Sequence, residues 1–378
     1  MKLMHLSDLH LGKRLNEFSL LEDQTYILRQ ICDAAAREKP DAVIIAGDVY
    51  DKTVPPAEAV ELFDSFLVYL SELGKPVFII SGNHDSAERI AFGGRLMRRS
   101  GVYLAPVYDG NVEPIRLEDE YGAVNIYMLP FVKPAHVRRW FPDAGIENYT
   151  DAVAAAVEVM NIDTSKRNVL VTHQFVTGAQ RCESEDISVG GTDSVSAGVL
   201  DSFDYVALGH LHSAQTLGGK MRYCGTPLKY SFSEARQQKS ITMAVLGEKG
   251  RLSIDTIPLK PLRELTELRG SYMELTARDF YADTDWRTDY THITLTDEED
   301  IPDAVGKLRV IYKGLMKLDY DNRRTRESLT LTAAENTEER SPLELFGELY
   351  EKQNNAPMSN EQRAYTAELI EKIWGEQQ

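Results

Sequence analysis

The chain has 378 residues, of which 43% are hydrophobic and 27% charged, a composition typical of a globular protein with more than one domain. Its net charge of −17 argues against a protein that coats nucleic acid through a basic surface, although bound divalent ions and a local basic stripe can reverse the field inside one nuclease cleft. No run of about 18 apolar residues predicts a membrane span, no signal-peptide pattern opens the chain, and three scattered cysteines (Cys32, Cys182, Cys224) favour the reducing cytoplasm.

Strand-like and helical segments alternate over the first half of the chain. Apolar runs predict strands over residues 3–8, 42–47, 77–81, 124–129, 168–173, 204–210, 221–225 and 241–246. Helical spacing predicts helices over residues 20–39 and 55–74, and the second has prolines at its start and Gly74 after its end. Strands that alternate with helices indicate βαβ units, so we expect residues 1–260 to form one α/β domain with two packed sheets.

The rest of the chain is predicted to contain a smaller domain and a tail. Proline and charge indicate a linker near residues 257–265, and residues 265–330 read as an α+β piece. Its predicted elements are a strand at 291–296, a helix at 302–314 and a strand at 315–321. A polar linker over 332–340 precedes a helical tail, 341–378, whose two helices begin at capping boxes that start with Ser341 and Ser359.

Five short motifs each follow a predicted strand. They are D-x-H (Asp8, His10), G-D (Asp48), G-N-H-D (Asn83, His84, Asp85), a single His173, and G-H-x-H (His210, His212). Loops at the carboxyl edge of a sheet converge, and side chains two residues apart in an extended segment point to the same side. Oxygen and nitrogen ligands without thiolates suit Mn²⁺, Fe²⁺ or Zn²⁺. The motifs therefore predict a metal site, whereas each motif alone also fits a turn or a structural histidine.

The residue types also predict separate roles within this site. Asp48 is the carboxylate that we expect to bridge two cations, and Asn83 supplies a neutral oxygen ligand. Two such cations would acidify a water and stabilise charge on the attacked phosphorus. His84 is predicted not to be a ligand but to hand a proton to the leaving oxygen. Asp85 would orient either His84 or its loop through a hydrogen bond.

The motifs, in this order, resemble those of the calcineurin-like metallophosphoesterases. The matching stretches are "DLHLG", "GDVYD", "GNHDS", "VTHQF" and "GHLH". Longer stretches resemble the SbcD nuclease subunits of bacterial double-strand-break repair complexes, namely "GDVYDKTVPPAEA", "ESEDISVGG", "FDYVALGHLHSAQ" and "RYCGTPLKYSFSE". The resemblance is closest over residues 1–250. It implies a four-layer α/β/β/α sandwich with a small α+β cap domain (265–330) and a C-terminal helical tail.

The resemblance also implies a ligand set and an activity. One Mn²⁺ would be held by Asp8, His10, Asp48 and His212, and a second by Asp48, Asn83, His173 and His210, with Mg²⁺ or another divalent ion as the alternative. The implied enzyme is a Mn²⁺-dependent DNA nuclease, a 3′-to-5′ exonuclease on double strands and an endonuclease on single strands. It would form a homodimer within a heterotetramer that includes an SbcC-like SMC-type ATPase. No GxxxxGK[ST] motif occurs in the sequence, so ATP chemistry must come from that partner.

Two basic clusters are candidates for contact with DNA phosphates, and a solvated helix face is the alternative for both. They comprise Arg89, Arg95, Arg98 and Arg99 after the G-N-H-D loop, and Lys133, Arg138 and Arg139 farther along. The tail carries two apolar stripes, Leu343, Phe346, Leu349 and Tyr350 on the first helix and Tyr365, Leu369 and Ile373 on the second. Because a polar linker separates these stripes from the rest, we expect them to bind the ATPase partner.

Two other functions remain open from the sequence. One is a phosphodiesterase or phosphatase that acts on a small substrate, since one fold serves many substrates. The other is a non-catalytic scaffold that keeps the fold for protein binding. The cap and the tail favour the nuclease, because an enzyme for a small molecule needs neither.

Overall fold

A computed structural model describes residues 1–180, 193–299, 301–323, 343, 346–347, 350 and 358–375. The predicted linker at 332–340, the capping-box residues Ser341 and Glu344, and Cys182 lie outside the described residues. The chain divides into two compact units. The first comprises Met1–Arg269, Met273–Ile293 and Asp303–Leu318, and the second Gly270–Tyr272, Thr294–Pro302 and Asp319–Gln378.

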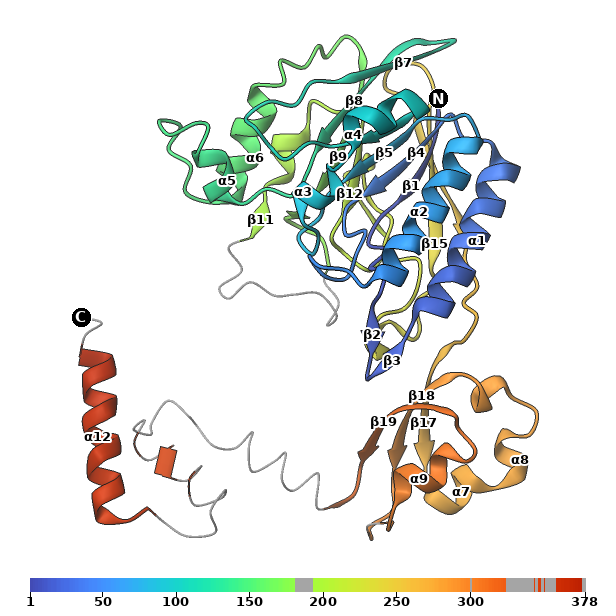
Figure 1. Ribbon diagram of the computed structural model, residues 1–378, viewed down its shortest axis with the longest axis vertical. Helices are drawn as coiled ribbons and strands as arrows, with labels where there is room; N and C mark the ends of the chain where they lie inside the picture. The colour runs from blue at the N-terminus through green and yellow to red at the C-terminus, as the bar shows by residue number, and fades with distance from the viewer. Residues whose placement is uncertain are drawn as a thin grey trace. The chain divides into compact units, whose positions relative to one another are not determined.

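The first unit contains a six-stranded sheet of order β16-β15-β1-β4-β5-β6 (Figure 1). Its strands are β1 (Lys2–Leu6), β4 (Ala42–Ala46), β5 (Val77–Ile80), β6 (Val102–Leu104), β15 (Ser240–Leu246) and β16 (Leu252–Pro258). The pairs β1·β4, β4·β5 and β5·β6 are parallel, while β15 runs antiparallel to both of its neighbours. Every residue of β4 and β5 is buried, as expected for parallel strands that are covered on both faces.

A second six-stranded sheet has the order β13-β14-β12-β9-β8-β7. Its strands are β7 (Ile115–Asp119), β8 (Gly122–Leu129), β9 (Arg167–His173), β12 (Tyr205–Gly209), β13 (Gln215–Leu217) and β14 (Met221–Tyr223). The four central strands are parallel, and the two edge strands pair antiparallel with their neighbours. The predicted strands of the first half lie in these two sheets, but β6, β7, β13 and β16 were not predicted.

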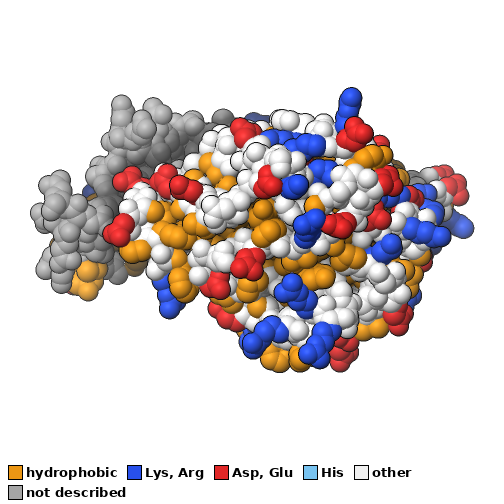
Figure 2. Space-filling view, turned by 90° about the horizontal axis from the view of Figure 1, so that it is seen from above, with side chains coloured by type: hydrophobic (Ala, Val, Ile, Leu, Met, Phe, Trp, Pro, Cys, Tyr) orange, Lys and Arg blue, Asp and Glu red, His pale blue; other side chains and the backbone are white. Residues whose placement is uncertain are grey.

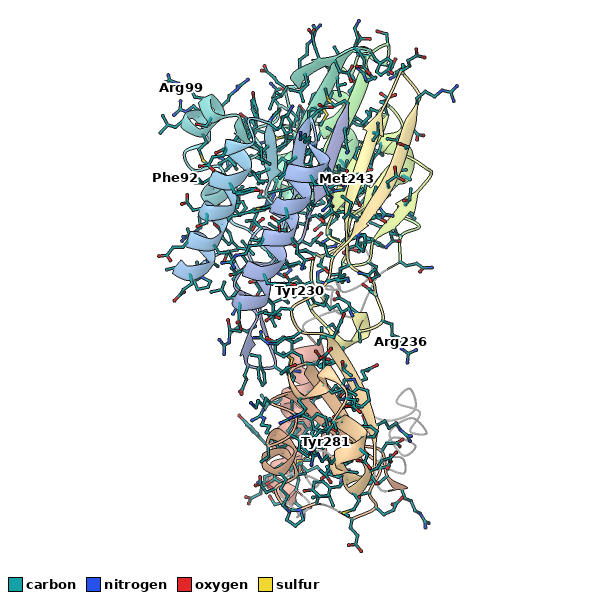
Figure 3. The ribbon with its side chains drawn as sticks, turned by 90° about the vertical axis from the view of Figure 1, so that its right-hand side faces the viewer. Phe92, Arg99, Tyr230, Arg236, Met243 and Tyr281 are labelled. Carbon is teal, nitrogen blue, oxygen red and sulfur yellow. The ribbon has the colours of Figure 1, made fainter. Side chains whose placement is uncertain are left out.

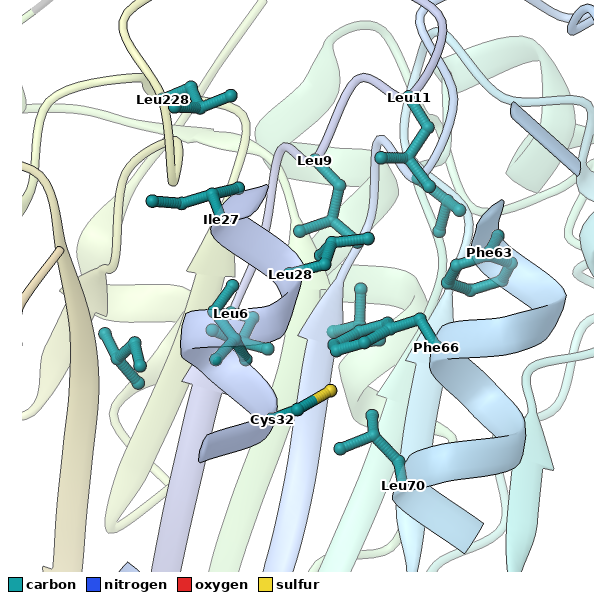
Figure 4. Packing of buried hydrophobic residues seen from close by; sticks show 14 of the residues in the cluster. Leu6, Leu9, Leu11, Ile27, Leu28, Cys32, Phe63, Phe66, Leu70 and Leu228 are labelled. Atoms are coloured by element: carbon teal, nitrogen blue, oxygen red, sulfur yellow. The ribbon is translucent and has the colours of Figure 1, made fainter. Parts of the chain in front are cut away.

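Three layers of apolar side chains hold four layers of backbone together. Helices α1 (Leu21–Glu38) and α2 (Ala57–Glu72) pack on the first sheet through a core that includes Leu6, Leu28 and Phe66 (Figure 4). A second core, with Leu3 and Val171, lies between the two sheets. A third packs α6 (Tyr149–Glu158) on the second sheet. This is the α/β/β/α arrangement that the resemblance implied, because each apolar face of a sheet needs a covering layer.

Short elements connect these layers. They are the hairpin β2 (Arg14–Leu15) and β3 (Phe18–Ser19), helices α3 (Ala87–Ile90), α4 (Gly94–Met97) and α5 (Pro134–Arg138), strands β10 (Phe175–Val176) and β11 (Ser194–Val195), and 3-10 turns η1 (Arg98–Ser100), η2 (Ala197–Leu200) and η3 (Phe232–Glu234). The β2–β3 hairpin was not predicted, because its strands are too short to show a periodic pattern. Its turn residues Asn16 and Glu17 both have positive φ, at 44° and 71°.

Residues after the linker form a three-stranded sheet of order β17-β18-β19. Its elements are β17 (Leu265–Gly270), α7 (Tyr272–Thr276), α8 (Arg278–Tyr281), η4 (Asp285–Arg287), β18 (Tyr290–Leu295), α9 (Ala304–Arg309) and β19 (Gly314–Tyr320). The predicted helix at 302–314 is shorter than expected. The chain turns after Arg309, and the Tyr312 side chain is buried with its hydroxyl donating to the Leu275 carbonyl at 2.6 Å. In the tail, α12 (Asn360–Gly375) begins directly after Ser359, the first residue of the predicted capping box, and Ser359 Oγ accepts from the Gln362 amide at 3.2 Å. Within the described part of the chain, no helix is both long and apolar enough to cross a bilayer.

We predict that Phe66→Ala lowers the free energy of unfolding by about 3–5 kcal/mol, because it leaves a cavity beneath α2. Phe66 is 3% exposed, whereas Val68 on the same helix is 50% exposed. The matched control Val68→Ala should change stability by no more than about 0.5 kcal/mol. Urea unfolding followed by circular dichroism measures both variants, and equal midpoints would contradict the packing of Phe66.

Candidate metal centre

The predicted site residues come from the carboxyl ends of strands in both sheets. Asp8, Asp48 and Asn83 follow β1, β4 and β5 of the first sheet. His173 ends β9 of the second sheet, and His210 follows β12. The sequence predicted convergence at the edge of one sheet. The structure instead places the site where the edges of two facing sheets meet.

A cross-sheet hydrogen bond sets the orientation of His173. Its Nδ1 lies 2.8 Å from the carbonyl oxygen of Ala46 in β4, so this nitrogen carries the proton and donates it. The other nitrogen, Nε2, then lies 3.3 Å from Asp48 Oδ2 and 3.0 Å from Asn83 Oδ1. His210 Nδ1 also lies 3.0 Å from Asn83 Oδ1. The structure thus brings together the four residues predicted to hold the second ion.

The other predicted ligands form an adjoining group. Ligand atoms of Asp8, His10 and His212 all lie within 4.8 Å of one another. His10 Nε2 is 3.8 Å from Asp48 Oδ2, which brings Asp48 next to this group as well. Asp48 belongs to two further groups of the same kind, one with His10 and His84 and one with Asp8 and His173. Asp48 therefore lies between the two predicted ligand sets, the position that a bridging carboxylate requires.

These residues fit a divalent cation because they are buried and because some of their nitrogen atoms lack a hydrogen-bond partner. Both ring nitrogens of His10 are buried without a hydrogen-bond partner, an arrangement that costs free energy unless something binds there. Asp8 and Asp48 are 0% and 2% exposed. Two buried carboxylates that face several imidazole nitrogens form the oxygen and nitrogen donor set that first-row divalent ions prefer.

The pKa values reflect the same crowding. Burial raises the pKa of Asp8 and lowers that of His10 well below its usual value. Burial would raise the pKa of Asp48, but the nearby His173 charge outweighs it and lowers this pKa. For His173, burial lowers the pKa and Asp48 raises it by more, to about 9. The protein therefore stabilises positive charge beside Asp48.

The backbone at the site is strained to bring these groups together. Asp8, His10, Asp48 and His210 have φ values of 53°, 44°, 49° and 99°. Such conformations cost about 1–3 kcal/mol each for non-glycine residues and persist only when the surroundings enforce them. The Asp8 amide donates to the Gly47 carbonyl at 3.0 Å, and the His10 amide donates to the Asp48 carbonyl at 3.0 Å. These bonds hold the first two loops against each other.

His84 and Asp85 hold different parts of the G-N-H-D loop. His84 Nδ1 lies 3.1 Å from the Asp51 carbonyl oxygen, and the Asp85 carboxylate accepts from the amides of Val49, Tyr50 and Gly82 at 3.1, 2.9 and 2.9 Å. Of the two roles considered for Asp85, the geometry favours orientation of the loop over direct contact with His84. Burial, followed by the Asp48 charge, raises the pKa of Asp85 to about 6.

Two family models match this chain. Residues 1–214 match the family model described as calcineurin-like phosphoesterase, and residues 260–354 match the SbcD_C model, described as type 5 capsule protein repressor C-terminal domain. The chain is 36% identical over 323 residues to the SbcD subunit of the SbcCD nuclease of Staphylococcus epidermidis, which covers 84% of this chain and 85% of that protein. The chain belongs to the SbcD family of calcineurin-like phosphoesterases. The chain is therefore a metal-dependent phosphodiesterase and a member of a nuclease family.

Two solved structures are also similar over part of the chain. A dimetal phosphatase from Danio rerio is 12% identical, covers 69% of this chain and 98% of its own, and gives a TM-score of 0.41. The protein TT1561 of Thermus thermophilus is 13% identical, covers 68% of this chain and 98% of its own, and gives a TM-score of 0.38.

Glu234 is a site residue of this SbcD family chain that sequence reasoning missed. Its Oε1 lies 3.2 Å from His212 Nδ1, which leaves His212 Nε2 for the metal group. Glu234 is fully buried, and Lys239 Nζ lies 2.6 Å from its other oxygen. Burial would raise the pKa of Glu234, but His212 and Lys239 lower it to about 2. No spacing in the sequence connects Glu234 with His212, 22 residues away, because a turn of the fold brings them together.

Gln24 and Tyr230 were missed for the same reason. Gln24 Nε2, on α1, donates to the His10 carbonyl at 2.7 Å. The Tyr230 hydroxyl donates to the Leu9 carbonyl at 2.5 Å, and its ring lies 5.6 Å from the His10 ring. Both side chains are buried and hold the strained D-x-H loop.

The predicted DNA contacts lie outside the metal groups, on the helices and turns after β5 and β8. Arg89, Arg95, Arg98 and Arg99 lie on or beside α3, α4 and η1, and Lys133, Arg138 and Arg139 lie on or beside α5. Figure 3 shows Phe92 and Arg99 on the opposite side of the first unit from Arg236. Among the predicted tail contacts, Phe346, Tyr365 and Leu369 are exposed, Leu343 and Tyr350 are half-buried, and Leu349 and the Ile373 side chain lie outside the described residues.

We predict that Glu234→Gln weakens Mn²⁺ binding by about 10–100-fold, because the neutral amide no longer orients and polarises His212. Isothermal titration of the metal-free chain measures the affinity. Glu248→Gln, a substitution in the turn after β15, is the matched control and should bind as the wild type does. Unchanged affinity in a folded Glu234→Gln chain would show that Glu234 does not support the metal.

Proposed function

We propose that the chain is a Mn²⁺-dependent DNA nuclease that degrades double strands from 3′ to 5′ and cuts single strands internally, in double-strand-break repair and hairpin processing. The observation that carries this proposal is the pair of buried ligand groups that share Asp48 beside the half-buried His84. The matching relative is a subunit of a nuclease, and we extend its activity to this chain on that basis.

We assign the two proposed Mn²⁺ ions to the two ligand groups. Asp8, His10, Asp48 and His212 would hold one ion, and Asp48, Asn83, His173 and His210 the other. When bound, two divalent ions supply an acidified water and neutralise charge on the attacked phosphate. The buried protein groups around them, Glu234 and Gln24 among them, fix the ligands before the substrate arrives.

His84 is the proposed general acid. Its Nδ1 donates to the Asp51 carbonyl, so Nε2 is the atom that can meet the substrate. A proton on Nε2 would pass to the oxygen that leaves phosphorus, which spares this oxygen from departing with a full negative charge. Asp85 supports His84 indirectly, since it fixes the loop that carries this residue.

The proposed partners are DNA, a second copy of the chain and an SbcC-like SMC-type ATPase, together in a heterotetramer. The matching relative is named as one subunit of the SbcCD nuclease, which motivates the ATPase. Phe92 and Leu96 are 84% and 74% exposed on or beside α3 and α4, which supports a homodimer through these helices. Exposed Tyr365 and Leu369 on α12 support a tail that binds the ATPase.

We retain the proposed domain boundaries of 1–260 for the nuclease, 265–330 for the cap that positions DNA, and 341–378 for the partner-binding tail after a linker at 332–340. Because the proposed substrate is chromosomal DNA, the proposed location is the cytoplasm, at the nucleoid.

We predict that the purified chain hydrolyses end-labelled duplex and single-stranded DNA with Mn²⁺ and not with EDTA. His84→Gln should retain Mn²⁺ and DNA binding but lose hydrolysis by about 10²–10⁴-fold, as expected when a general acid is removed. Parallel reactions with bis-p-nitrophenyl phosphate show whether the active site works on any diester. Hydrolysis of this diester with DNA untouched, even after addition of the ATPase, would favour a small-substrate enzyme. Loss of Mn²⁺ from His84→Gln would instead make His84 a ligand.

We predict that deletion of residues 341–378 abolishes capture of the ATPase partner, because the proposed contact surface is removed. Hydrolysis of bis-p-nitrophenyl phosphate by the truncated chain alone should persist, since no proposed metal ligand lies in the tail. A pull-down with the purified SbcC-like ATPase measures capture. Recovery of the ATPase by the truncated chain would place the contact elsewhere.

A further inference from the structure

We propose that Lys239 is a positioning residue of the metal centre, where it fixes His212 for one of the two proposed ions. Lys239 directly precedes β15 of the first sheet, whereas His212 lies in the loop after β12 of the second sheet. The inference rests on the proposed metal-dependent function and deepens it, because it names a residue that sets metal affinity without being a ligand.

Lys239 is a buried cation. Its exposed fraction is 6%, whereas the face in Figure 2 carries Lys and Arg side chains on its surface, intermixed with Asp and Glu. A lysine is almost never fully buried unless it is paired, because an isolated charge loses its hydration on burial. The groups around the Lys239 ammonium therefore show what this cation does.

Three acceptors surround the Lys239 ammonium group, as many as it has protons to donate. Lys239 Nζ lies 2.6 Å from Glu234 Oε2, 2.9 Å from the His212 carbonyl oxygen and 2.8 Å from Gln237 Oε1. Two of these contacts lead to His212. One reaches its backbone directly, and the other reaches its ring through Glu234, whose Oε1 lies 3.2 Å from His212 Nδ1.

Other donors support the same arrangement without adding charge. The Thr226 amide donates to the His212 carbonyl at 3.2 Å, so this oxygen keeps a donor in the absence of Lys239. Thr226 Oγ1 and the Tyr230 amide each lie 3.4 Å from Glu234 Oε2, farther than Lys239 Nζ. The contact through Glu234 is therefore the one that depends most on Lys239.

The charge of Lys239 lets Glu234 stay buried as a carboxylate. Glu234 is 0% exposed, and a buried carboxylate without a cation is strongly unfavourable. A carboxylate that accepts from the imidazole of a metal ligand orients the ring and makes its other nitrogen a better ligand. Because this chain of contacts ends at His212, we expect the loss of Lys239 to weaken the ion that His212 would hold and to spare the other.

The test measures Mn²⁺ binding by the full-length, metal-free chain, with free Mn²⁺ followed by electron paramagnetic resonance. Lys239→Met keeps much of the side chain but removes its charge, and should weaken one of the two ions by about 10–100-fold, as is usual when a group that supports a metal ligand is lost. The other ion should bind as in the wild type. The matched control is Lys249→Met, which removes a lysine from a surface ion pair with Asp204 and should leave both affinities unchanged.

A double-mutant cycle with Glu234→Gln shows whether Lys239 acts through Glu234. The double variant buries neither charge and should bind the weakened ion no less tightly than Glu234→Gln alone. If the losses from the two substitutions instead multiply, Lys239 acts independently of Glu234 and the inference is wrong. Circular dichroism checks folding. If Lys239→Met alone does not fold, the comparison of the double variant with Glu234→Gln still decides.

The outcomes separate this inference from the proposed function. Unchanged binding of both ions by a folded Lys239→Met chain would overturn the inference and leave the nuclease assignment intact. Equal weakening of both ions would also overturn it, since this would reflect a general loss of structure. A wild-type chain that binds two ions but hydrolyses only bis-p-nitrophenyl phosphate would instead overturn the nuclease assignment, while selective weakening by Lys239→Met would still support the role of Lys239.

Discussion

The hydrogen bond from His173 Nδ1 to the Ala46 carbonyl is the contact on which the rest of the site depends. It joins the end of β9 in one sheet to the end of β4 in the other, and it turns His173 Nε2 toward Asp48. The sheets approach so closely here that a Cβ on Gly209 would overlap the same carbonyl. A fixed distance between the two sheet edges therefore fixes the distance between ligands that each sheet supplies.

This arrangement concentrates unfavourable features at one place. Four candidate ligand residues have positive φ, two carboxylates are buried, and the His10 ring lacks hydrogen-bond partners. Gly82 must be glycine for a related reason, since a Cβ there would overlap the Asp48 carboxylate. The large cores on either side of the sheets offset this cost, and a bound cation would give the buried His10 ring a partner and compensate the buried carboxylates. Backbone strain and buried atoms without hydrogen-bond partners both lower stability, and where they occur together they are typical of a functional site.

Much of this could be predicted from the sequence, because apolar strands that end in polar motifs are local signals. Such strands indicated the α/β fold. Asp8 and His10 do lie together as the i, i+2 spacing predicted, but in a loop where both residues have positive φ and not in the extended segment that this spacing assumes. Glu234, Gln24 and Tyr230 could not be found in this way, since each reaches the site only through a tertiary contact with a residue distant in the sequence. The meeting of two sheets was missed too, because periodicity does not say which sheet a strand joins.

We propose that this chain holds two divalent ions that share Asp48. Electron paramagnetic resonance of the metal-free chain titrated with Mn²⁺ tests it directly, because two Mn²⁺ ions about 3.5–4 Å apart, the spacing of two-metal sites, interact magnetically. We expect two ions per chain and the spectrum of a spin-coupled pair, which Asp48→Asn should convert to that of isolated ions. One ion per chain, or two uncoupled ions in the wild type, would contradict the account.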